Sequence, residues 1–423
     1  MCIRDSRYHE YPGFAHEGIP YTDQVISWFL DHKKINAPEK VRVRAAALIS
    51  AKSHWVKILQ RENPFAFVEA EAEVLINNTI RLASENVLAV ELTPPAELIN
   101  PDQKVTVVWN VNDIREVKLK DNKITLYDKN YKPARLNKNP DIEGPLSQVT
   151  TTPFAVVIGT SSKDSLMVKL CRQKAQEFVD SWKDWQKYEP RVFTDKELTE
   201  DDMKNYSLIL YGGPEANIIT KKLINKIPLE ISSDKIKVSG KTFKVNDACI
   251  QMVYPHPLNT QRYVSIIGAT SYAGMYFFVR ENDNLDFYIK DGCVPNNRLG
   301  HFMDKLYVAK GVFDYNWQIS DDLLDRGDPE IRKTCPVRKV LPNLTTIIEN
   351  LPKIDQNAYK AIAGNYELQP GVLVSVFIDS GKLMAKTPDG MVMQLFPTSE
   401  TEYFVDVTDL QLTFIKNEDG SIT

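Results

Sequence analysis

The chain has 423 residues, of which 43% are hydrophobic and 26% charged, and its formal net charge is −4 at pH 7. This length is typical of roughly three domains, and the composition is that of ordinary globular protein. The small negative charge and the lack of a basic cluster argue against nucleic acid as a partner. The sequence contains no run of ~18 apolar residues, so no membrane span is predicted.

The first 35 residues contain the strongest catalytic candidate, His16. It lies in Pro12–Gly18, a Gly-flanked loop that would leave an imidazole free to accept and return a proton. An amphipathic helix is predicted over 21–32, directly after this loop. No Gly-x-Ser-x-Gly motif occurs in the chain, so the sequence offers no nucleophile elbow. An ordinary loop histidine is the alternative interpretation. The apolar face of the predicted helix consists of Val25, Trp28, Phe29 and Leu30.

Residues 36–140 are predicted to form an immunoglobulin-like β-sandwich. About seven short runs alternate between apolar and polar residues, as in 68–74, and turn sequences such as Asn77–Asn78 separate them. The acidic positions of the run 68–74 are interpreted as a solvated face, with a binding surface as the alternative. These positions are Glu69, Glu71 and Glu73.

After a polar connector, strand–loop–helix units predict an α/β domain over 150–317. Buried-type strands at 154–158, 208–211 and 263–267 favour an open, mostly parallel sheet of the flavodoxin or Rossmann type. Turns at their ends could hold an anion, since open sheets bind ligands there. No Gly-x-Gly-x-x-Gly or P-loop motif occurs, so tight structural turns are the alternative and no cofactor is predicted. The candidate turn residues are Gly159, Thr160–Ser162, Gly212, Gly213, Gly268 and Thr270–Ser271.

The C-terminal third divides into a linker and a small β domain. Residues 318–354 are charged and carry Gly-Asp-Pro and Cys-Pro sequences, which are typical of a connecting segment. Residues 355–423 contain five predicted strands joined by tight turns, which favours a small up-and-down barrel or curved sheet. The last run, Ser421–Thr423, begins a strand that does not continue, so we expect this domain to be truncated.

The remaining histidines and the cysteines are interpreted as structural. No metal site is predicted, because His54, His256 and His301 each lack a second ligand at metal-binding spacing. The five cysteines show no Cys-x-x-Cys motif, which is typical of buried free thiols with at most one incidental pair. They are Cys2, Cys171, Cys249, Cys293 and Cys335.

The order of these segments resembles a family of bacterial prolyl-oligopeptidase-like serine hydrolases with long C-terminal extensions. The resemblance implies that residues 1–35 are the C-terminal remnant of an α/β-hydrolase domain and that His16 is its catalytic base. The Ser and Asp of such a triad have no counterpart here, so we expect them upstream, and residues 1–6 are interpreted as a non-native sequencing remnant. The likeness is carried by Pro12–Gly18 and its helix, Lys52–Val56, Gly144–Pro145 before Pro153–Phe154, Leu208–Pro214 and Met252–Val264.

The tail from Ile362 to Phe414 is similar to a small β domain appended to β-lactamase-like and peptidase-like serine enzymes. Together the resemblances imply a peptidase or esterase acting on a peptide or ester substrate, exported to the periplasm or the exterior. They leave room for an oligomer, and the fragment alone should be inactive. The alternative is a non-catalytic ligand-binding or assembly module, which would recognise its ligand at the Gly-ended strand loops of 150–317.

Overall fold

The computed structural model shows a chain of several β-sheets in two compact units. One unit comprises Met1–Glu143 with Asp314–Trp317, and the other Gly144–Phe313 with Gln318–Thr423. Strands predominate over helices, so the multidomain, strand-rich organisation is confirmed. The structure describes residues 10, 12–13, 22–33, 35–276, 278, 280, 284–291, 307–329, 352, 354–369, 372–388, 392–405, 411–415, 417 and 422.

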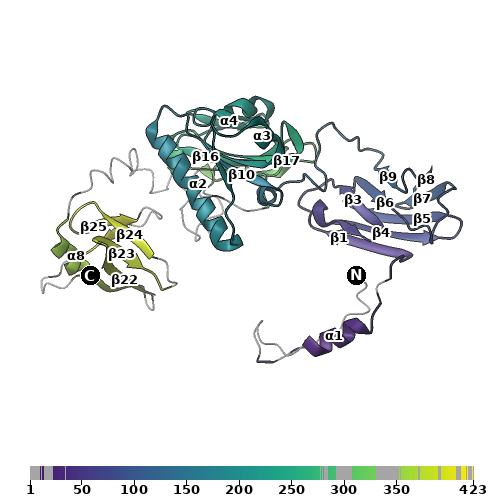
Figure 1. Ribbon diagram of the computed structural model, residues 1–423, viewed down its shortest axis with the longest axis horizontal. Coiled ribbons are helices and arrows are strands. Elements are labelled where there is room, and N and C mark those ends of the chain that lie inside the picture. The colour runs from purple at the N-terminus through teal and green to yellow at the C-terminus, as the bar shows by residue number, and fades with distance from the viewer. Residues whose placement is uncertain are drawn as a thin grey trace. The chain divides into compact units, whose positions relative to one another are not determined.

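The first described element is helix α1 (Thr22–Leu30), which lies ahead of the sheets of its unit (Figure 1). Three of its apolar side chains are largely solvent-accessible: Ile26 is 51% exposed, Phe29 63% and Leu30 80%. The helix is amphipathic, as predicted, and its apolar face is only partly buried among the described residues, since Val25 and Trp28 are half-buried.

Two sheets follow, in which most neighbouring strands are antiparallel, and their inner faces share one hydrophobic core. Side chains alternate along the strands, so that Val68, Ala70 and Ala72 are fully buried while the glutamates between them point outward. The five-stranded sheet has the order β1 (Lys40–Ala45), β4 (Val68–Leu75), β5 (Thr79–Glu85), β7 (Val105–Trp109) and β8 (Asp113–Val117). The four-stranded sheet has the order β2 (Lys52–Ser53), β3 (Val56–Gln60), β6 (Ala89–Leu92) and β9 (Ile124–Tyr127).

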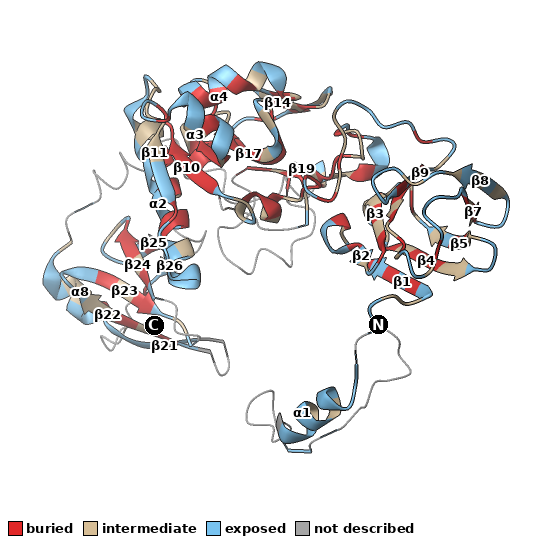
Figure 2. Ribbon diagram, turned by 45° about the vertical axis from the view of Figure 1, so that its right-hand side comes forward, coloured by how far each residue is buried: buried red, intermediate tan, exposed pale blue. Residues whose placement is uncertain are grey.

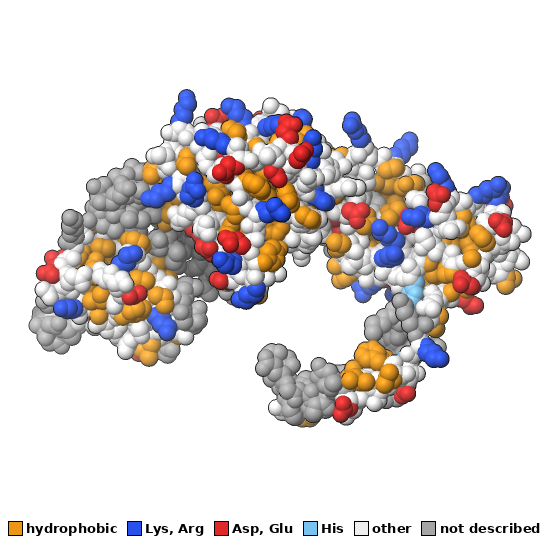
Figure 3. Space-filling view, viewed as in Figure 1, with side chains coloured by type: hydrophobic (Ala, Val, Ile, Leu, Met, Phe, Trp, Pro, Cys, Tyr) orange, Lys and Arg blue, Asp and Glu red, His pale blue; other side chains and the backbone are white. Residues whose placement is uncertain are grey.

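Cations on neighbouring strands neutralise the outward glutamates of β4. Lys40 pairs with Glu71 at 2.7 Å, and the other pairs are Arg42–Glu69 and Arg81–Glu73. Cross-strand pairs of this kind stabilise a sheet modestly and leave no uncompensated acidic surface. Basic and acidic side chains are likewise interspersed on the face seen in Figure 3, in keeping with the small net charge.

The second unit is built on an eight-stranded mixed sheet. Its order is β11 (Arg191–Thr194), β10 (Phe154–Ile158), β12 (Ser207–Tyr211), β17 (Asn259–Ala269), β16 (Ala248–His256), β18 (Phe287–Asp291), β19 (Ala309–Gly311) and β20 (Leu324–Arg326). The first four strands are mutually parallel, and each later neighbour is antiparallel. The expectation of a mostly parallel sheet therefore holds for only half of it, because a tight turn at Pro257–Leu258 folds β16 back onto β17.

Helices and a small sheet accompany this large sheet. The long helix α2 packs on β10 and β12 (Figure 1), and its Leu170, Cys171, Ala175, Phe178 and Val179 are buried. In Figure 2, the strands β10 and β17 of the large sheet are coloured mostly as buried. The helices are α2 (Ser165–Gln186), α3 (Glu200–Asn205), α4 (Ile218–Leu223) and α5 (Tyr272–Tyr276). The small antiparallel sheet consists of β13 (Leu229–Ile231), β14 (Lys235–Val238) and β15 (Lys241–Lys244). Short 3-10 helices are η2 (Leu48–Ser50) in the first unit, and η3 (Leu146–Thr150), η4 (Ile224–Lys226) and η6 (Asp321–Leu323) in the second.

The C-terminal part forms an antiparallel meander with its own core, in agreement with the predicted up-and-down order. It has six strands where five were expected, because Gly364–Gln369 adds one at the start. Helix α8 (Gln356–Ile362) precedes β21 (Gly364–Gln369), β22 (Val372–Asp379), β23 (Lys382–Lys386), β24 (Val392–Pro397), β25 (Glu402–Val405) and β26 (Gln411–Thr413). Across the described parts of the chain, no helix combines the length and apolarity needed to cross a membrane.

Candidate functional site

The predicted catalytic base, His16, lies outside the described residues, as do His301 and three of the cysteines, Cys2, Cys293 and Cys335. The structure therefore leaves the role of His16 a prediction. It does place the other candidates: the turns at the strand ends, the histidines His54 and His256, and the cysteines Cys171 and Cys249.

The turns at the carboxyl ends of the parallel strands meet around one buried carboxylate, Asp195, which follows β11 and is 1% exposed. One Asp195 oxygen accepts hydrogen bonds from Thr160 N (3.0 Å) and Thr160 Oγ1 (2.6 Å). The other accepts from Ser161 Oγ (2.8 Å) and from Ile218 N (3.0 Å), at the first residue of α4. The donors that were expected to bind an anionic ligand are thus hydrogen-bonded to the carboxylate of Asp195.

The glycines of these turns allow the chain to pack closely on itself. A Cβ at Gly159 would lie 2.6 Å from the carbonyl oxygens of Tyr211 and Ala216. A Cβ at Gly268 would lie 2.5 Å from Ile231 Cδ1, so a side chain of β13 fills the space beside that turn. The geometry favours tight structural turns at this edge over a ligand site.

His256 is buried at the end of β16 and is held neutral. Its Nδ1 accepts a hydrogen bond from Leu258 N at 3.0 Å, and its side chain is 0% exposed. Burial lowers the pKa of His256 to about 4, which makes it a poor general base at neutral pH. His54 occupies the turn between β2 and β3 with φ of 44°.

The buried His256 predicts a titration that can be measured. In proton NMR of the whole chain, the His256 imidazole should titrate with a midpoint of about 4, below its ordinary 6.5. Because the unfolded chain binds this proton more tightly, the contribution of neutral His256 to stability is full above pH 6.5 and is lost as pH falls toward 4. A midpoint above 6 would show that the imidazole is accessible and would reopen a proton-transfer role.

The two described cysteines are free, buried thiols, as predicted. Burial raises the pKa of Cys171 to about 12, and it also raises the pKa of Cys249, so neither supplies a thiolate nucleophile at neutral pH. Within the described ranges, no group of three or more His, Cys, Asp or Glu side chains is arranged to hold a metal ion.

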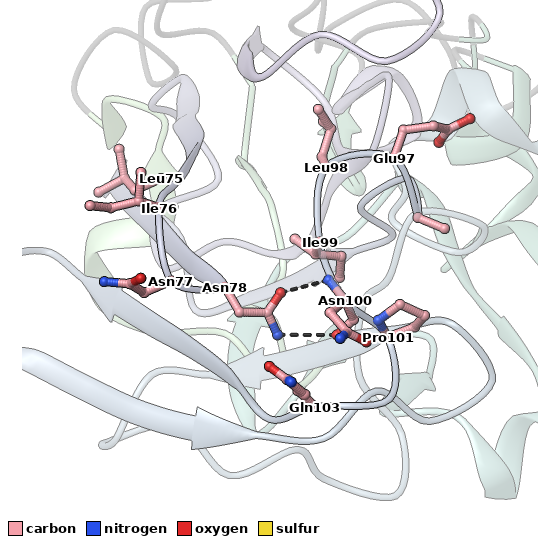
Figure 4. Close-up of a pocket in the computed structure, with 11 residues that line it drawn as sticks. Leu75, Ile76, Asn77, Asn78, Glu97, Leu98, Ile99, Asn100, Pro101 and Gln103 are labelled. Carbon is pink, nitrogen blue, oxygen red and sulfur yellow. Dashed lines mark hydrogen bonds between the residues drawn. The ribbon is translucent and has the colours of Figure 1, made fainter.

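A broad hollow in the first unit is lined by the loops 75–78 and 96–103 and measures about 780 Å³. Figure 4 shows Asn78 and Asn100 directed toward each other across it. Asn78 Oδ1 accepts from Asn100 N at 2.7 Å, and its Nδ2 donates to the carbonyl oxygens of Asn100 (3.1 Å) and Lys104 (3.0 Å). The amide of Asn78 thus joins the two loops. The hollow results from the way in which these hydrogen bonds hold the loops together.

A second hollow, of about 610 Å³, lies beside α2 in the second unit. Aromatic residues dominate its lining: Phe178, Trp182 and Trp185 from α2, Tyr211 from β12, and Phe278. Phe178 and Trp182 are four residues apart on α2, a spacing that is typical of a helix stripe facing a core. A stripe that lines a site can be told from one that faces a core only by the arrangement of α2, β12 and Arg280 around one space.

Neither protein-family models nor curated proteins yield a match to this chain.

Proposed function

We propose that this chain supplies His16 and a series of non-catalytic accessory modules to a serine hydrolase of the prolyl-oligopeptidase type. The reaction would be hydrolysis of a peptide or ester bond by acyl transfer. His16 would take the proton of a serine and return it to the leaving group. The serine and its carboxylate would come from another part of a longer protein, which the resemblance suggests is periplasmic or extracellular.

The observation that carries this proposal is the exposed apolar side of α1. A nine-residue helix is only marginally stable alone, and an amphipathic helix normally buries its apolar stripe against a partner. Phe29 and Leu30 remain 63% and 80% exposed. These features support a helix that completes a hydrolase domain, with His16 in the loop before it.

The finer fold assignments are part of the same proposal. We assign residues 1–35 to the end of an α/β-hydrolase domain and 36–140 to an immunoglobulin-like sandwich, supported by two sheets that share one core. We assign 150–317 to a Rossmann-like accessory domain, supported by four parallel strands with α2 packed on them. We assign 318–354 to a linker and 355–423 to a small barrel-like module, supported by the antiparallel meander.

The test compares two proteins with a serine-directed fluorophosphonate probe. The 423-residue chain should not be labelled, because its sequence contains no Gly-x-Ser-x-Gly nucleophile elbow. The product of the longer gene should be labelled and should hydrolyse a p-nitrophenyl ester. His16→Ala in that longer protein should lower ester hydrolysis by a factor on the order of 10³ or more.

His32→Ala is the matched control, since His32 is exposed at the end of α1 and its Nδ1 is hydrogen-bonded to Trp28 O. It should leave hydrolysis unchanged. Stoichiometric labelling of the 423-residue chain, removed by one Ser→Ala substitution, would overturn the proposal, as would full activity in His16→Ala.

A further inference from the structure

The aromatic hollow beside α2 has the build of a small-ligand site. Its volume of about 610 Å³ falls within the ~300–1,000 Å³ range common for such sites. The ring centroids of Phe178 and Trp182 are 5.9 Å apart, and those of Tyr211 and Phe278 are 6.4 Å apart at 77°. Trp185 lies at the rim and is 77% exposed. The lining therefore combines flat aromatic faces with polar and charged side chains, and it is accessible.

Three polar atoms of this lining are buried without a hydrogen-bond partner among the described residues. They are Trp182 Nε1, Tyr211 Oη and Arg280 Nε. Each of them can donate a hydrogen bond, and two of them can only donate. Buried polar groups are nearly always satisfied, so three unpartnered donors around one space call for an acceptor.

The same hollow carries a positive charge that has no counter-charge among the residues the structure describes. Arg280 Cζ lies 4.3 Å from the ring centroid of Phe178, and in the described parts of the chain no carboxylate forms an ion pair with it. Burial lowers the pKa of Arg280, yet a guanidinium keeps its proton in proteins. The other cation, Lys174, is 3.2 Å from Glu177 and is thereby neutralised. The net requirement of the site is one negative charge.

We propose that this hollow binds a monoanionic aromatic carboxylate, with the carboxylate on Arg280 and the ring among Phe178, Trp182 and Phe278. A carboxylate matches the planar guanidinium and offers acceptors to the unpartnered donors. A single uncompensated cation suits one negative charge better than the two of a phosphate. The chemistry is shared by a free arylalkanoic acid and by a peptide ending in an aromatic residue.

The test titrates the 423-residue chain with 3-phenylpropionate and with the tripeptide Gly-Gly-Phe, followed by calorimetry and tryptophan fluorescence. At least one of these two carboxylates should bind saturably. The matched neutral ligands, 3-phenylpropionamide and Gly-Gly-Phe amide, should bind at least about tenfold more weakly, because they lack the charge that Arg280 requires. Trp182 and Trp185 line the site, so the fluorescence should change as it fills.

Two variants locate the binding. Arg280→Gln should weaken carboxylate binding about 10- to 100-fold and abolish the preference over the amide. Trp182→Phe keeps a ring but removes one donor, and it should weaken binding by about 2- to 10-fold. Arg172→Gln is the control, since Arg172 is an exposed residue of α2 outside the lining.

Three results would each overturn the proposal. They are no saturable binding of either carboxylate at ~10 mM, equal binding of acid and amide, or unchanged binding in both Arg280→Gln and Trp182→Phe. Should Arg280→Gln fail to fold, Trp182→Phe and the acid–amide comparison still decide. The readout is binding without hydrolysis, so it is independent of the role proposed for His16.

Discussion

Replacing Asp195 with alanine should lower the free energy of unfolding of the second unit by about 4 kcal/mol, one of the two largest effects we expect in this chain. The carboxylate accepts four hydrogen bonds, from Thr160 N, Thr160 Oγ1, Ser161 Oγ and Ile218 N. Hydrogen bonds to a charged group contribute about 1.5–3 kcal/mol each, and part of that is recovered when water enters the cavity. The expected loss in free energy of unfolding follows because four donors lose the same acceptor together.

Hydrogen exchange measured by mass spectrometry is the suitable readout, because it resolves the unit from the rest of the chain. Peptides covering Thr160 and Ile218 should exchange much faster in Asp195→Ala, whereas peptides from the two sheets of the first unit should not change. Asp184→Ala, at an exposed position of α2, is the control and should have an effect within about 0.5 kcal/mol. Equal protection in the two variants would mean that Asp195 does not hold the turns together.

Asp195 also shows how far the sequence could predict this site. Thr160–Ser162 could be placed at a strand end from the apolar run before it, and the structure has them there. The partner could not be found, because Asp195 is 35 residues from Thr160 and follows a weak, half-exposed strand, β11. The sequence around a single aspartate in a loop does not show whether that aspartate is buried. It therefore could not show whether the donors of the turn bind a carboxylate of the chain itself or are available to a ligand.

The feature of the fold that could not be predicted from the sequence was the direction of the strands. Phe154–Ile158 and Ser207–Tyr211 are buried on both faces and are parallel, as their continuous apolar character predicts. Ala248–His256 is equally buried along its whole length, yet it is antiparallel. Burial on both faces records coverage by neighbouring elements and carries no information on direction, which the turn at Pro257–Leu258 decides.

The aromatic hollow was missed for a related reason. The stripe of Phe178 and Trp182 on α2 has the spacing of a core face, and Phe178 is indeed buried. Trp182 lies on the same stripe but faces the hollow that Tyr211 and Arg280 also line. The distinguishing residues come from a strand and a loop far along the chain, so no local pattern on the helix could separate core from cavity.

The second large effect concerns the ion pair of Arg61 and Glu143 in the first unit. Their side chains are only 12% and 2% exposed, and Arg61 Nη2 lies 2.6 Å from Glu143 Oε1. Glu143 Oε2 also accepts from Leu48 N at 2.7 Å. Arg61→Ala should lower the free energy of unfolding of this unit by about 3 kcal/mol at pH 7, because it leaves a buried carboxylate without its cation.

The pH dependence of that loss tests its electrostatic origin. Burial raises the pKa of Glu143 above its ordinary 4.5, and the charge of Arg61 opposes that shift. A carboxyl group with a raised pKa stabilises the folded state below its unfolded pKa, and that contribution is lost as pH rises through the folded pKa. Removing Arg61 raises the folded pKa further, so the cost of Arg61→Ala should be small near pH 4 and should grow toward pH 7.

Two further variants separate charge from packing. Glu143→Gln added to Arg61→Ala should recover most of the loss at pH 7, because the double variant no longer holds a buried carboxylate that has lost Arg61. Arg81→Ala removes an exposed pair with Glu73 and should cost less than about 1 kcal/mol at any pH. A loss in Arg61→Ala that is equal at pH 4 and pH 7, and unrelieved by Glu143→Gln, would instead assign the effect to lost side-chain packing and to the hydrogen bond from Arg61 Nη1 to Ala46 O.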